Sequence, residues 1–390
     1  MKITEWYDSS KLKNKNIRGE VKLLPGGVEI ALSEIHSVGV VSCDVEDFIP
    51  GRYIRAEMKL YLSGTVKSEV FATWCKNGES IFEEYIHDME KIVPFEGADK
   101  LRISAMVYGS GGGYAKISNV TVSEGECISE RKAKVAGLSI PYGFVWEHKL
   151  RTCEDNIRDS LERIDALMKE EKVDLVVLTE TFNSRITSVE YDETFITLEG
   201  EEMARMKSKA KEHGIYLAFS LRERTAEGGV ANSAVLIDRQ GEIVSYYRKC
   251  HLTLSEKLSG LTPGNEIVVC DTDFGKVGFA ICWDLYYPET ARMLVKQGAE
   301  LIINPTAGFE INMHTQRAKD AGVFVVTGGV WGSNCTVIAP DGNVLAEGSM
   351  MGAAIAEIDF NKRYPVQYLS VNGWGERRNV YYREMREDLY

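Results

Sequence analysis

The most informative stretch of this sequence is Val277-Gly-Phe-Ala-Ile-Cys282-Trp283-Asp284-Leu-Tyr-Tyr-Pro288-Glu289. The pattern predicts an apolar strand that runs into Cys282, then a short turn, and then a helix that starts near Pro288. A second apolar run over 301–304 predicts the next strand. This order places one thiol near the carboxyl end of a strand, where open α/β sheets build their functional sites. A position inside the strand would instead suit a buried filler.

Length and charge restrict the class of protein. The chain has 390 residues, which is too long for one ordinary domain, so we expect two. A net charge of -12 argues against nucleic-acid and anionic-membrane partners. The sequence shows no signal-peptide pattern and no run of about 18 apolar residues. The 8 cysteines are scattered without a Cys-x-x-Cys pair, which favours a reduced, cytoplasmic setting.

Residues 1–130 are predicted to form an all-β accessory domain. Ile54, Ala56, Met58 and Leu60 alternate with polar neighbours, which is the period of a half-buried strand, and residues 101–107 repeat it. Glycine clusters supply the turns, and only residues 80–92 fit a short helix. Several short strands of this kind indicate a β-sandwich of the jelly-roll type.

The last strand pattern of this half, residues 113–122, resembles that of jelly-roll carbohydrate-binding modules. The resemblance implies a possible glycan contact through exposed aromatic side chains. The candidates are Trp6, Tyr53, Trp74 and Tyr108. The alternative is that these aromatics form the sandwich core, and we favour a structural or oligomer-building role for this domain.

Residues 131–390 are predicted to be an α/β catalytic domain in which strands and helices alternate. An apolar stripe over 157–168 follows Thr152, a suitable helix cap, and the buried strand 174–180 comes next. A further helix over 198–213 is expected to end at Gly214. Alternation of this kind places helices over the faces of a sheet.

Three reactive side chains, Glu180, Lys249 and Cys282, stand at the ends of predicted strands in this domain. A thiol is mostly protonated at neutral pH, so it needs a base or a cation to become a nucleophile. A carboxylate in a low-dielectric pocket has a raised pKa and can accept that proton. A lysine balances the charge and can donate to an oxyanion. The spacing alone leaves open whether the three side chains meet. Taken separately, Cys282 could be a buried core residue, Lys249 a solvated surface lysine and Glu180 the cap of a turn.

Three blocks resemble the signature blocks of the nitrilase (carbon–nitrogen hydrolase) superfamily, and they occur in that family's order over residues 133–360. The blocks are Leu178-Thr-Glu180, Tyr247-Arg-Lys249-Cys-His251-Leu252 and Gly278-Phe-Ala-Ile-Cys282-Trp283-Asp284-Leu-Tyr-Tyr-Pro288-Glu289. The resemblance implies a four-layer αββα fold preceded here by the β-sandwich domain. It also implies a cofactor-free enzyme that assembles as a homo-oligomer.

The resemblance assigns roles by position. Glu180 would be the general base, Lys249 the stabiliser of the tetrahedral intermediate and Cys282 the nucleophile. The backbone N–H of Trp283 would share the oxyanion with Lys249, and Glu256 matches a second active-site glutamate. From the sequence itself, Tyr286 and Tyr287 are candidates for the substrate pocket. The histidines show no ligand spacing, so we expect no metal site.

The implied reaction is attack of a thiolate on an amide carbon, followed by hydrolysis of a thioester. The pair Trp283-Asp284 after the cysteine favours amides over nitriles, because strict nitrilases usually carry glutamate at the second position. We therefore expect a small linear amide or N-carbamoyl amine as substrate. The alternatives are a nitrile hydrolase that uses the same residues, and a non-catalytic glycan-binding protein whose second domain is a retired enzyme.

Overall fold

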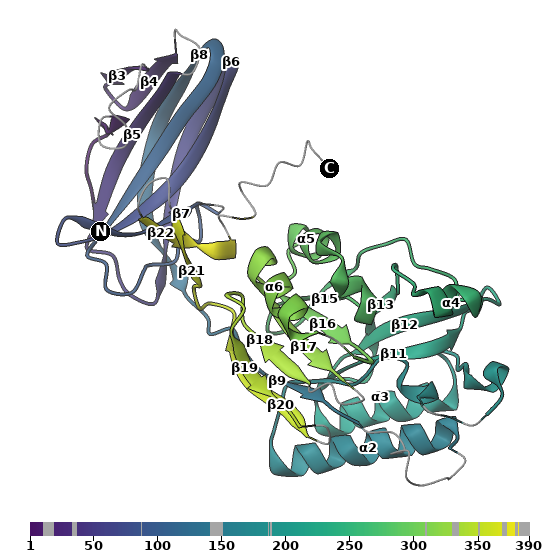
Figure 1. The fold of residues 1–390 in the computed structure, drawn as a ribbon. Helices are drawn as coiled ribbons and strands as arrows, with labels where there is room; N and C mark the ends of the chain where they lie inside the picture. The colour runs from purple at the N-terminus through teal and green to yellow at the C-terminus, as the bar shows by residue number, and fades with distance from the viewer. Residues whose placement is uncertain are drawn as a thin grey trace. The chain divides into compact units, whose positions relative to one another are not determined.

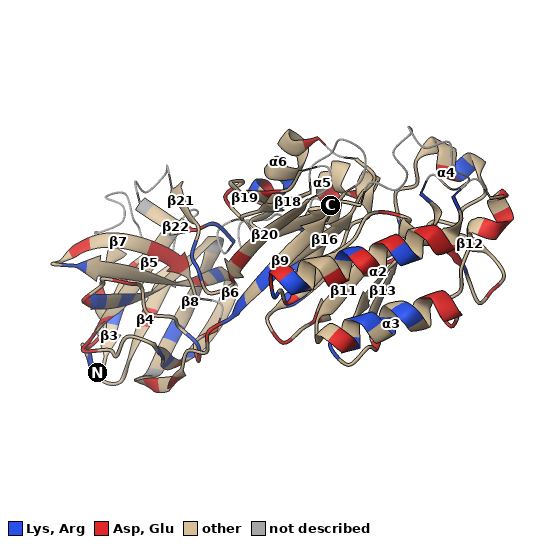
Figure 2. Ribbon diagram, turned by 90° about the horizontal axis from the view of Figure 1, so that it is seen from below, with Lys and Arg blue, Asp and Glu red and all other residues tan. Residues whose placement is uncertain are grey.

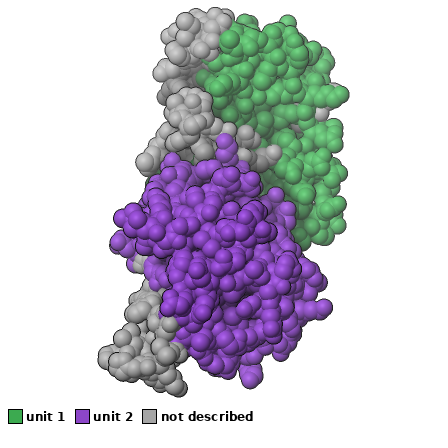
Figure 3. Space-filling view, turned by 90° about the vertical axis from the view of Figure 1, so that its right-hand side faces the viewer, with its two compact units in different colours: residues 1–129, 365–390 green, residues 130–364 purple. Residues whose placement is uncertain are grey.

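The computed structural model describes residues 1–10, 19–32, 37–86, 88–140, 151–185, 187, 189–308, 310–329, 335–349, 352–368, 373–378 and 381. Two compact units make up the chain: Met1–Ser129 with Pro365–Tyr390, and Glu130–Tyr364 (Figure 3). The expectation that one domain would run from 131 to 390 is therefore wrong at its end. The C-terminal segment joins the first unit because β22 (Gly373–Glu376) pairs with β7 (Glu79–Tyr85) of that unit's sheet.

The first unit is a single hydrogen-bonded sheet of ten strands, as expected of an all-β domain (Figure 1). Its two longest strands, β6 (Arg52–Lys76) and β8 (Lys100–Cys127), pair antiparallel over most of their length. The strand β7 replaces the short helix considered for residues 80–92, because alternate side chains such as Phe82 and Glu84 turn into the core. The remaining strands are β1 (Lys2–Ile3), β2 (Tyr7–Asp8), β3 (Glu20–Leu24), β4 (Gly27–Leu32), β5 (Ser37–Glu46), β21 (Pro365–Tyr368) and β22.

None of the four aromatic side chains considered for glycan stacking is fully exposed. Trp74 is 0% exposed and its indole N–H donates to Glu84 Oε1 at 2.8 Å, so this ring belongs to the core. Trp6 is half-buried and packs against two apolar clusters of the sheet. Tyr53 and Tyr108 are also half-buried. These positions favour the packing alternative for Trp74 and Trp6.

The second unit has four layers, two six-stranded sheets covered by helices on their outer faces (Figure 1). The order of one sheet is β13-β12-β11-β10-β9-β20, and that of the other is β14-β15-β16-β17-β18-β19. One apolar cluster lies between the sheets and includes Val177 and Phe279. A second joins the first sheet to α2 and α3, and a third joins the other sheet to α5 and α6. The expected αββα arrangement is confirmed.

The elements of this unit are β9 (Lys132–Leu138), α2 (Cys153–Glu170), β10 (Leu175–Val177), α3 (Glu201–His213), β11 (Tyr216–Arg224), β12 (Val230–Ile237), β13 (Ile243–Arg248), α4 (Leu254–Leu258), β14 (Val269–Asp271), β15 (Lys276–Phe279), α5 (Pro288–Lys296), β16 (Leu301–Pro305), α6 (Ile311–Ala321), β17 (Phe324–Gly328), β18 (Thr336–Ile338), β19 (Val344–Glu347) and β20 (Ala353–Asp359). Short 3₁₀ turns η1 (Phe182–Ser184), η2 (Tyr191–Thr194) and η3 (Cys282–Tyr286) connect some of them.

Helix ends follow the signals in the sequence. Thr152 caps α2 and forms a reciprocal capping box with Asp155, and Gly214 ends α3 with a left-handed φ of 64°. Acidic and basic residues alternate along the outer sides of α2 and α3 (Figure 2). The Lys209 ammonium joins the two helices through Asp165 at 2.8 Å. None of the helices in the described part of the chain is long and apolar enough to cross a membrane.

Two glycines allow the sheets of this unit to approach closely beside the candidate site. A Cβ atom added to Gly328 at the end of β17 would lie 2.3 Å from the carbonyl oxygen of Leu178 in the other sheet. A Cβ atom on Gly137 of β9 would lie 2.0 Å from the carbonyl oxygen of Thr327. Neither position has space for a side chain. This contact fixes Leu178, and hence Glu180 two residues later, against the second sheet.

Candidate active site

The ends of strands from both sheets supply the three predicted residues. Glu180 lies three residues after β10, Lys249 directly follows β13, and Cys282 follows β15 at the start of η3. The Lys249 ammonium donates to Glu180 Oε1 at 2.8 Å, and both side chains are almost fully buried. The charges of Glu180 and Lys249 both act on the Cys282 thiol. The structure therefore brings the three residues together.

Three side-chain donors hold the Glu180 carboxylate. Its Oε1 accepts from Lys249 and from Asn232 Nδ2 at 2.9 Å, and its Oε2 accepts from Arg185 Nη2 at 2.8 Å. The Arg185 Nε also donates to the Glu180 backbone carbonyl at 2.8 Å. Burial opposes ionisation, but the charges of Lys249 and Arg185 outweigh it and lower the pKa of Glu180 to about 2. The expectation of a raised pKa is wrong, because it omitted the arginine.

Lys249 is 1% exposed and lies between two carboxylates. Its ammonium contacts Glu180 and both carboxylate oxygens of Glu256, at 3.0 and 2.9 Å. Burial disfavours its charge, but Glu180 supplies the largest opposing effect and the pKa of Lys249 is raised. Asn232 Nδ2 also bridges the two glutamates, since it lies 2.8 Å from Glu256 Oε1. The predicted proximity of Glu256 to the site is thus present.

A capping box explains why Glu256 points at Lys249. It stands at the third position of α4, where its Oε2 accepts from the backbone N–H of Thr253 at 2.8 Å. The Thr253 hydroxyl donates to the same oxygen at 3.0 Å. These bonds orient a carboxylate that a five-residue helix would not otherwise fix.

Cys282 has a strained backbone. Its φ is 44°, and Thr181, directly after Glu180, has the same φ; among the described non-glycine residues only Asp47 and Asn77 share this sign. Such conformations cost about 1–3 kcal/mol and concentrate at functional sites. The turn leaves Cys282 Sγ beside the loop that follows β16, 3.9 Å from the carbonyl oxygen of Gly308. Thr179 of the first sheet donates to the Thr306 carbonyl in that loop at 2.8 Å.

The thiol of Cys282 is protonated in this resting arrangement. Burial raises its pKa to about 11, the Glu180 carboxylate adds to the rise, and Lys249 only partly offsets it. A reactive thiolate therefore requires removal of the proton by a base. Glu180, whose charge acts on this thiol, is ionised and is the candidate for that base.

Asp284 joins the lysine loop to the cysteine turn and is 0% exposed. Its Oδ2 accepts from the Ile281 backbone N–H at 2.9 Å and from the Tyr247 hydroxyl at 2.8 Å. Its Oδ1 accepts from the His251 backbone N–H at 2.7 Å. Both oxygens of Asp284 are thus occupied by donors of the protein itself, and the role of this side chain is to position the cysteine turn. Asp284 can therefore influence the choice between amides and nitriles only indirectly.

The remaining predicted residues follow the cysteine. Trp283 lies in the first turn of η3, where backbone N–H groups have no acceptor within the helix. Its ring is 37% exposed and packs 4.7 Å from the half-buried ring of Tyr286. Burial raises the pKa of Tyr286, and the Cys282 side chain contributes to the rise. Tyr287 instead stacks on His251 at 4.1 Å. A pocket role remains a prediction for both tyrosines.

Arg185, Asn232 and Asp284 are site residues that sequence reasoning missed as a group. Arg185 follows Glu180 by five residues, and this short separation could have indicated that its guanidinium reaches the carboxylate. Asn232 had no such signal, because its place depends on the pairing of β12 with β11. Asp284 was noticed as part of a motif but not as the link between Tyr247 and the cysteine turn.

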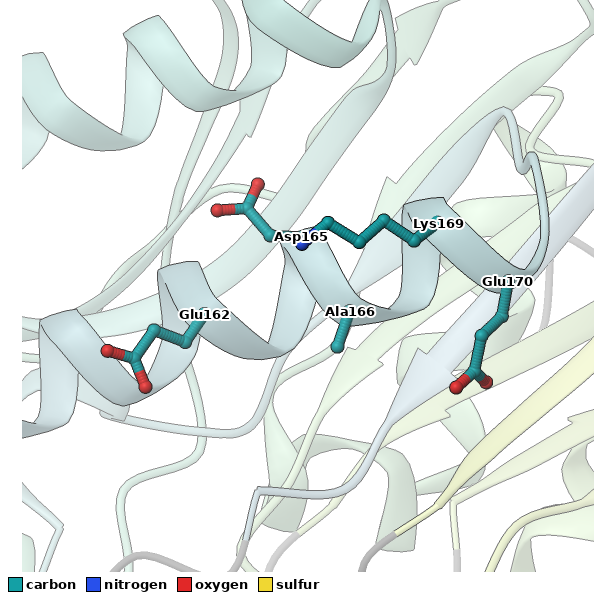
Figure 4. A pocket seen from close by; sticks show the side chains of 5 residues that line it. All are labelled: Glu162, Asp165, Ala166, Lys169 and Glu170. Atoms are coloured by element: carbon teal, nitrogen blue, oxygen red, sulfur yellow. The ribbon is translucent and has the colours of Figure 1, made fainter.

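One cluster outside this site has the residue types of a cation site. Atoms of Asp165, Glu212 and His213 lie within 4.8 Å of one another. The Lys209 ammonium already lies among them, 2.8 Å from both Asp165 and Glu212. Asp165 also lines a shallow pocket along α2 (Figure 4). The Lys209 ammonium thus already pairs with both carboxylates of this cluster.

Comparison with known proteins identifies the family. The sequence profile of the carbon–nitrogen hydrolase family matches residues 134–368. Omega-amidase NIT2 of Xenopus tropicalis is 29% identical over 52% of this chain and 83% of its own length. N-carbamoylputrescine amidase of Arabidopsis thaliana is 32% identical over 40% of this chain and 56% of its own length. The crystal structure of a carbon–nitrogen hydrolase from Helicobacter pylori G27 shares the fold, with a TM-score of 0.56 and 24% identity over 67% of this chain and 97% of that one. Since the family profile covers more than half of the sequence, the chain belongs to the carbon–nitrogen hydrolase family of enzymes, the nitrilase superfamily.

Proposed function

We propose that this enzyme hydrolyses a small linear amide or N-carbamoyl amine through a thioester on Cys282. The observation that carries the proposal is the buried contact of Lys249 with Glu180 at 2.8 Å, together with the electrostatic coupling of both groups to the Cys282 thiol. A nucleophile, a base and a cation in one desolvated site are the requirements of acyl transfer.

In the first half-reaction, Cys282 Sγ attacks the amide carbon while its proton moves to Glu180. We propose that the two events are concerted, because burial raises the pKa of the thiol whereas Lys249 and Arg185 lower the pKa of Glu180. A thiolate formed in advance would be strongly disfavoured. The C–S bond forms, the carbonyl oxygen becomes an oxyanion, and Lys249 and the Trp283 N–H stabilise it, with about 3 kcal/mol from each well-placed donor.

To complete this first half-reaction, Glu180 returns the proton to the leaving nitrogen. The C–N bond breaks, ammonia or an amine leaves, and a thioester remains on Cys282. In the second half-reaction, water attacks the thioester carbon and gives its proton to Glu180. The C–S bond breaks, the acid is released, and the proton returns to the thiol. The net change is amide plus water to carboxylic acid plus amine.

The relatives support the substrate class. The matched proteins are named omega-amidase and N-carbamoylputrescine amidase, and both names describe cleavage of an amide-type C–N bond.

Ammonia release from a panel of short amides, each matched with the nitrile of the same length, tests the proposal. Cys282→Ala should lower the rate on the active amide by about 10³-fold or more without loss of the folded state, as measured by circular dichroism. Cys270→Ala is the matched control, since it removes another half-buried thiol, on β14, and should retain activity. Full activity in Cys282→Ala, or faster turnover of nitriles than of their matched amides, would contradict the proposal.

A further inference from the structure

The loop that follows β16 lies beside the Cys282 sulfur. The strands β15 and β16 are parallel neighbours with Phe279 opposite Ile303, so Cys282 and Thr306 each lie three residues beyond that pair. Cys282 Sγ is 3.9 Å from the carbonyl oxygen of Gly308, and the Thr306 hydroxyl donates to the same oxygen at 2.8 Å. The sulfur and the hydroxyl therefore share one acceptor at the ends of adjacent strands.

Contacts with both sheets fix the position of this loop. The backbone N–H of Thr306 donates to the Gly328 carbonyl at 2.9 Å, and the Thr306 carbonyl accepts from the Thr179 hydroxyl at 2.8 Å. The Thr306 side chain is 0% exposed, and its Oγ1 accepts from the backbone N–H of Gly308 at 3.3 Å. Because a hydroxyl hydrogen rotates freely, it can change its acceptor while this backbone stays in place.

Two uncharged donors of the loop act on the thiol. Burial has the largest effect on the pKa of Cys282 and raises it, and the Glu180 carboxylate adds to the rise. Hydrogen bonds from the Thr306 side chain and from the backbone N–H of Ala307 lower this pKa, because a donor stabilises the negatively charged sulfur. Lys249 acts in the same direction, but its ammonium also serves two carboxylates. The loop thus supplements the lysine at the sulfur.

We infer that Thr306 is a further catalytic residue, whose hydroxyl turns from the Gly308 carbonyl to the Cys282 sulfur when that sulfur carries negative charge. The Ala307 N–H is the second donor of this pair. The inference rests on the proposed hydrolysis and assigns to the sulfur a set of donors separate from those proposed for the oxyanion.

Negative charge develops on the sulfur twice in the proposed reaction. It develops first when the thiol proton moves to Glu180 while the C–S bond forms. It develops again when the C–S bond of the second tetrahedral intermediate breaks and the electron pair of that bond returns to sulfur. Glu180 then holds the proton taken from water, so the departing sulfur is a thiolate until that proton reaches it. Donors that act on the sulfur at these moments lower both barriers.

Thr306→Val tests the inference, since valine is close to threonine in size and lacks the hydroxyl. Alkylation of Cys282 by iodoacetamide at neutral pH, followed by peptide mass spectrometry, should slow about threefold or more. The slowing is smaller than the loss of thiolate, because a thiolate of higher pKa is the better nucleophile. For the active amide, kcat should fall about tenfold with little change in KM, since charge on the sulfur develops only after binding.

Thr306→Ser retains a hydroxyl and should restore most of both rates. Thr306→Ala should behave like Thr306→Val, so the test does not depend on how valine packs. Fast alkylation in both variants that lack the hydroxyl would overturn the inference, and so would a serine variant as slow as the valine variant.

Thr327→Val is the matched control. Thr327 is also a 0% exposed threonine near the end of a strand, β17, but its hydroxyl bonds with Thr336 instead of the loop beside the cysteine. Urea unfolding should show a loss of stability for Thr327→Val as for Thr306→Val, because each change removes a buried hydrogen bond. Alkylation and kcat should stay at the wild-type level in Thr327→Val. An equal slowing in the two variants would show a structural effect and would overturn the inference.

Alkylation separates this inference from the proposed function, because it requires no amide substrate. If the wild type hydrolyses no amide, but Thr306→Val slows alkylation and Thr306→Ser restores it, the sulfur donor stands and amide hydrolysis fails. If amides are hydrolysed through Cys282 but neither rate depends on the Thr306 hydroxyl, the sulfur donor fails alone.

Discussion

Arg185 Nη2 donates to Glu180 Oε2 at 2.8 Å, on the oxygen that Lys249 does not contact. The candidate base is thus held between two cations, which explains its lowered pKa despite nearly complete burial. A carboxylate stabilised this strongly is a weak base. In the proposed reaction it accepts the thiol proton as the C–S bond forms, so the arginine would set both the charge of Glu180 and the timing of proton transfer.

The pH dependence of activity should respond to Arg185. Glu180 must be ionised to accept a proton, so activity is present above its pKa and is lost as pH falls through it. Removing the guanidinium in Arg185→Gln leaves burial less opposed and raises the pKa of Glu180. The acid limb of kcat/KM should therefore move to higher pH, as measured by pH–rate profiles. Arg158→Gln, on the exposed side of α2, should leave the limb in place; an unmoved limb in Arg185→Gln would refute the ion-pair account.

Lys249→Met should destabilise the protein in a pH-dependent way. The change leaves the carboxylates of Glu180 and Glu256 sharing Asn232 without a cation between them, at a cost of about 3–5 kcal/mol near neutral pH. Their repulsion raises the pKa of at least one carboxyl above its ordinary value. The loss is therefore largest above that folded-state pKa and is relieved as pH falls through it towards the unfolded value.

Urea unfolding at neutral pH and near pH 5 measures this effect against the wild type. Lys257→Met is the matched control, since Lys257 is an exposed lysine of the same α4 segment and should show little loss at either pH. A loss for Lys249→Met that is equal at the two pH values would show that the ammonium does not separate two buried charges.

Asp284→Asn should weaken the link between the two sheets. A neutral amide has one acceptor oxygen, so it cannot serve the Ile281 N–H, the Tyr247 hydroxyl and the His251 N–H together. At least one buried donor loses its partner, at about 1–3 kcal/mol. Thermal unfolding should show a midpoint lower by roughly 2–4 °C for each kcal/mol lost.

Tyr247→Phe is the comparison for Asp284→Asn, because it removes one donor and keeps the carboxylate. Its loss should be nearer 1 kcal/mol. A smaller effect for Asp284→Asn than for Tyr247→Phe would mean that the carboxylate does not hold the cysteine turn.

Gly328→Ala should lower both stability and activity. The added methyl group would meet backbone atoms of Val177 and Leu178, which cannot rotate away, so we expect a loss of about 1–3 kcal/mol in the free energy of unfolding. Leu178 would shift and carry Glu180 with it, so kcat should fall as well. Gly229→Ala, whose new atom would find only ordinary contacts, should change neither quantity appreciably.

The sequence was sufficient for features that depend on local pattern. The cap at Thr152, the end of α3 at Gly214 and the strand ends before Glu180, Lys249 and Cys282 all follow from neighbouring residues. The four-layer arrangement came from the resemblance of whole blocks, and the family match agrees with it. The catalytic roles of these residues remain predictions.

Features set by contacts between distant segments were not predictable. The pKa direction of Glu180 was wrong because the position of Arg185 relative to it depends on the η1 turn. Thr306 gained meaning only from the pairing of β15 with β16, which places its loop beside Cys282. The last residues were assigned to the wrong unit because the pairing of β22 with β7 joins parts of the chain that are far apart in sequence.

The central claim is that Cys282 carries the acyl group of an amide during turnover. Rapid acid quenching of the working enzyme, followed by intact-protein and peptide mass spectrometry, tests it most directly. The account predicts a mass increase equal to the acyl group less one hydrogen, located on the peptide that contains Cys282 and absent from Cys282→Ala. Amide turnover that persists in Cys282→Ala, with no adduct on that peptide in the wild type, would contradict it.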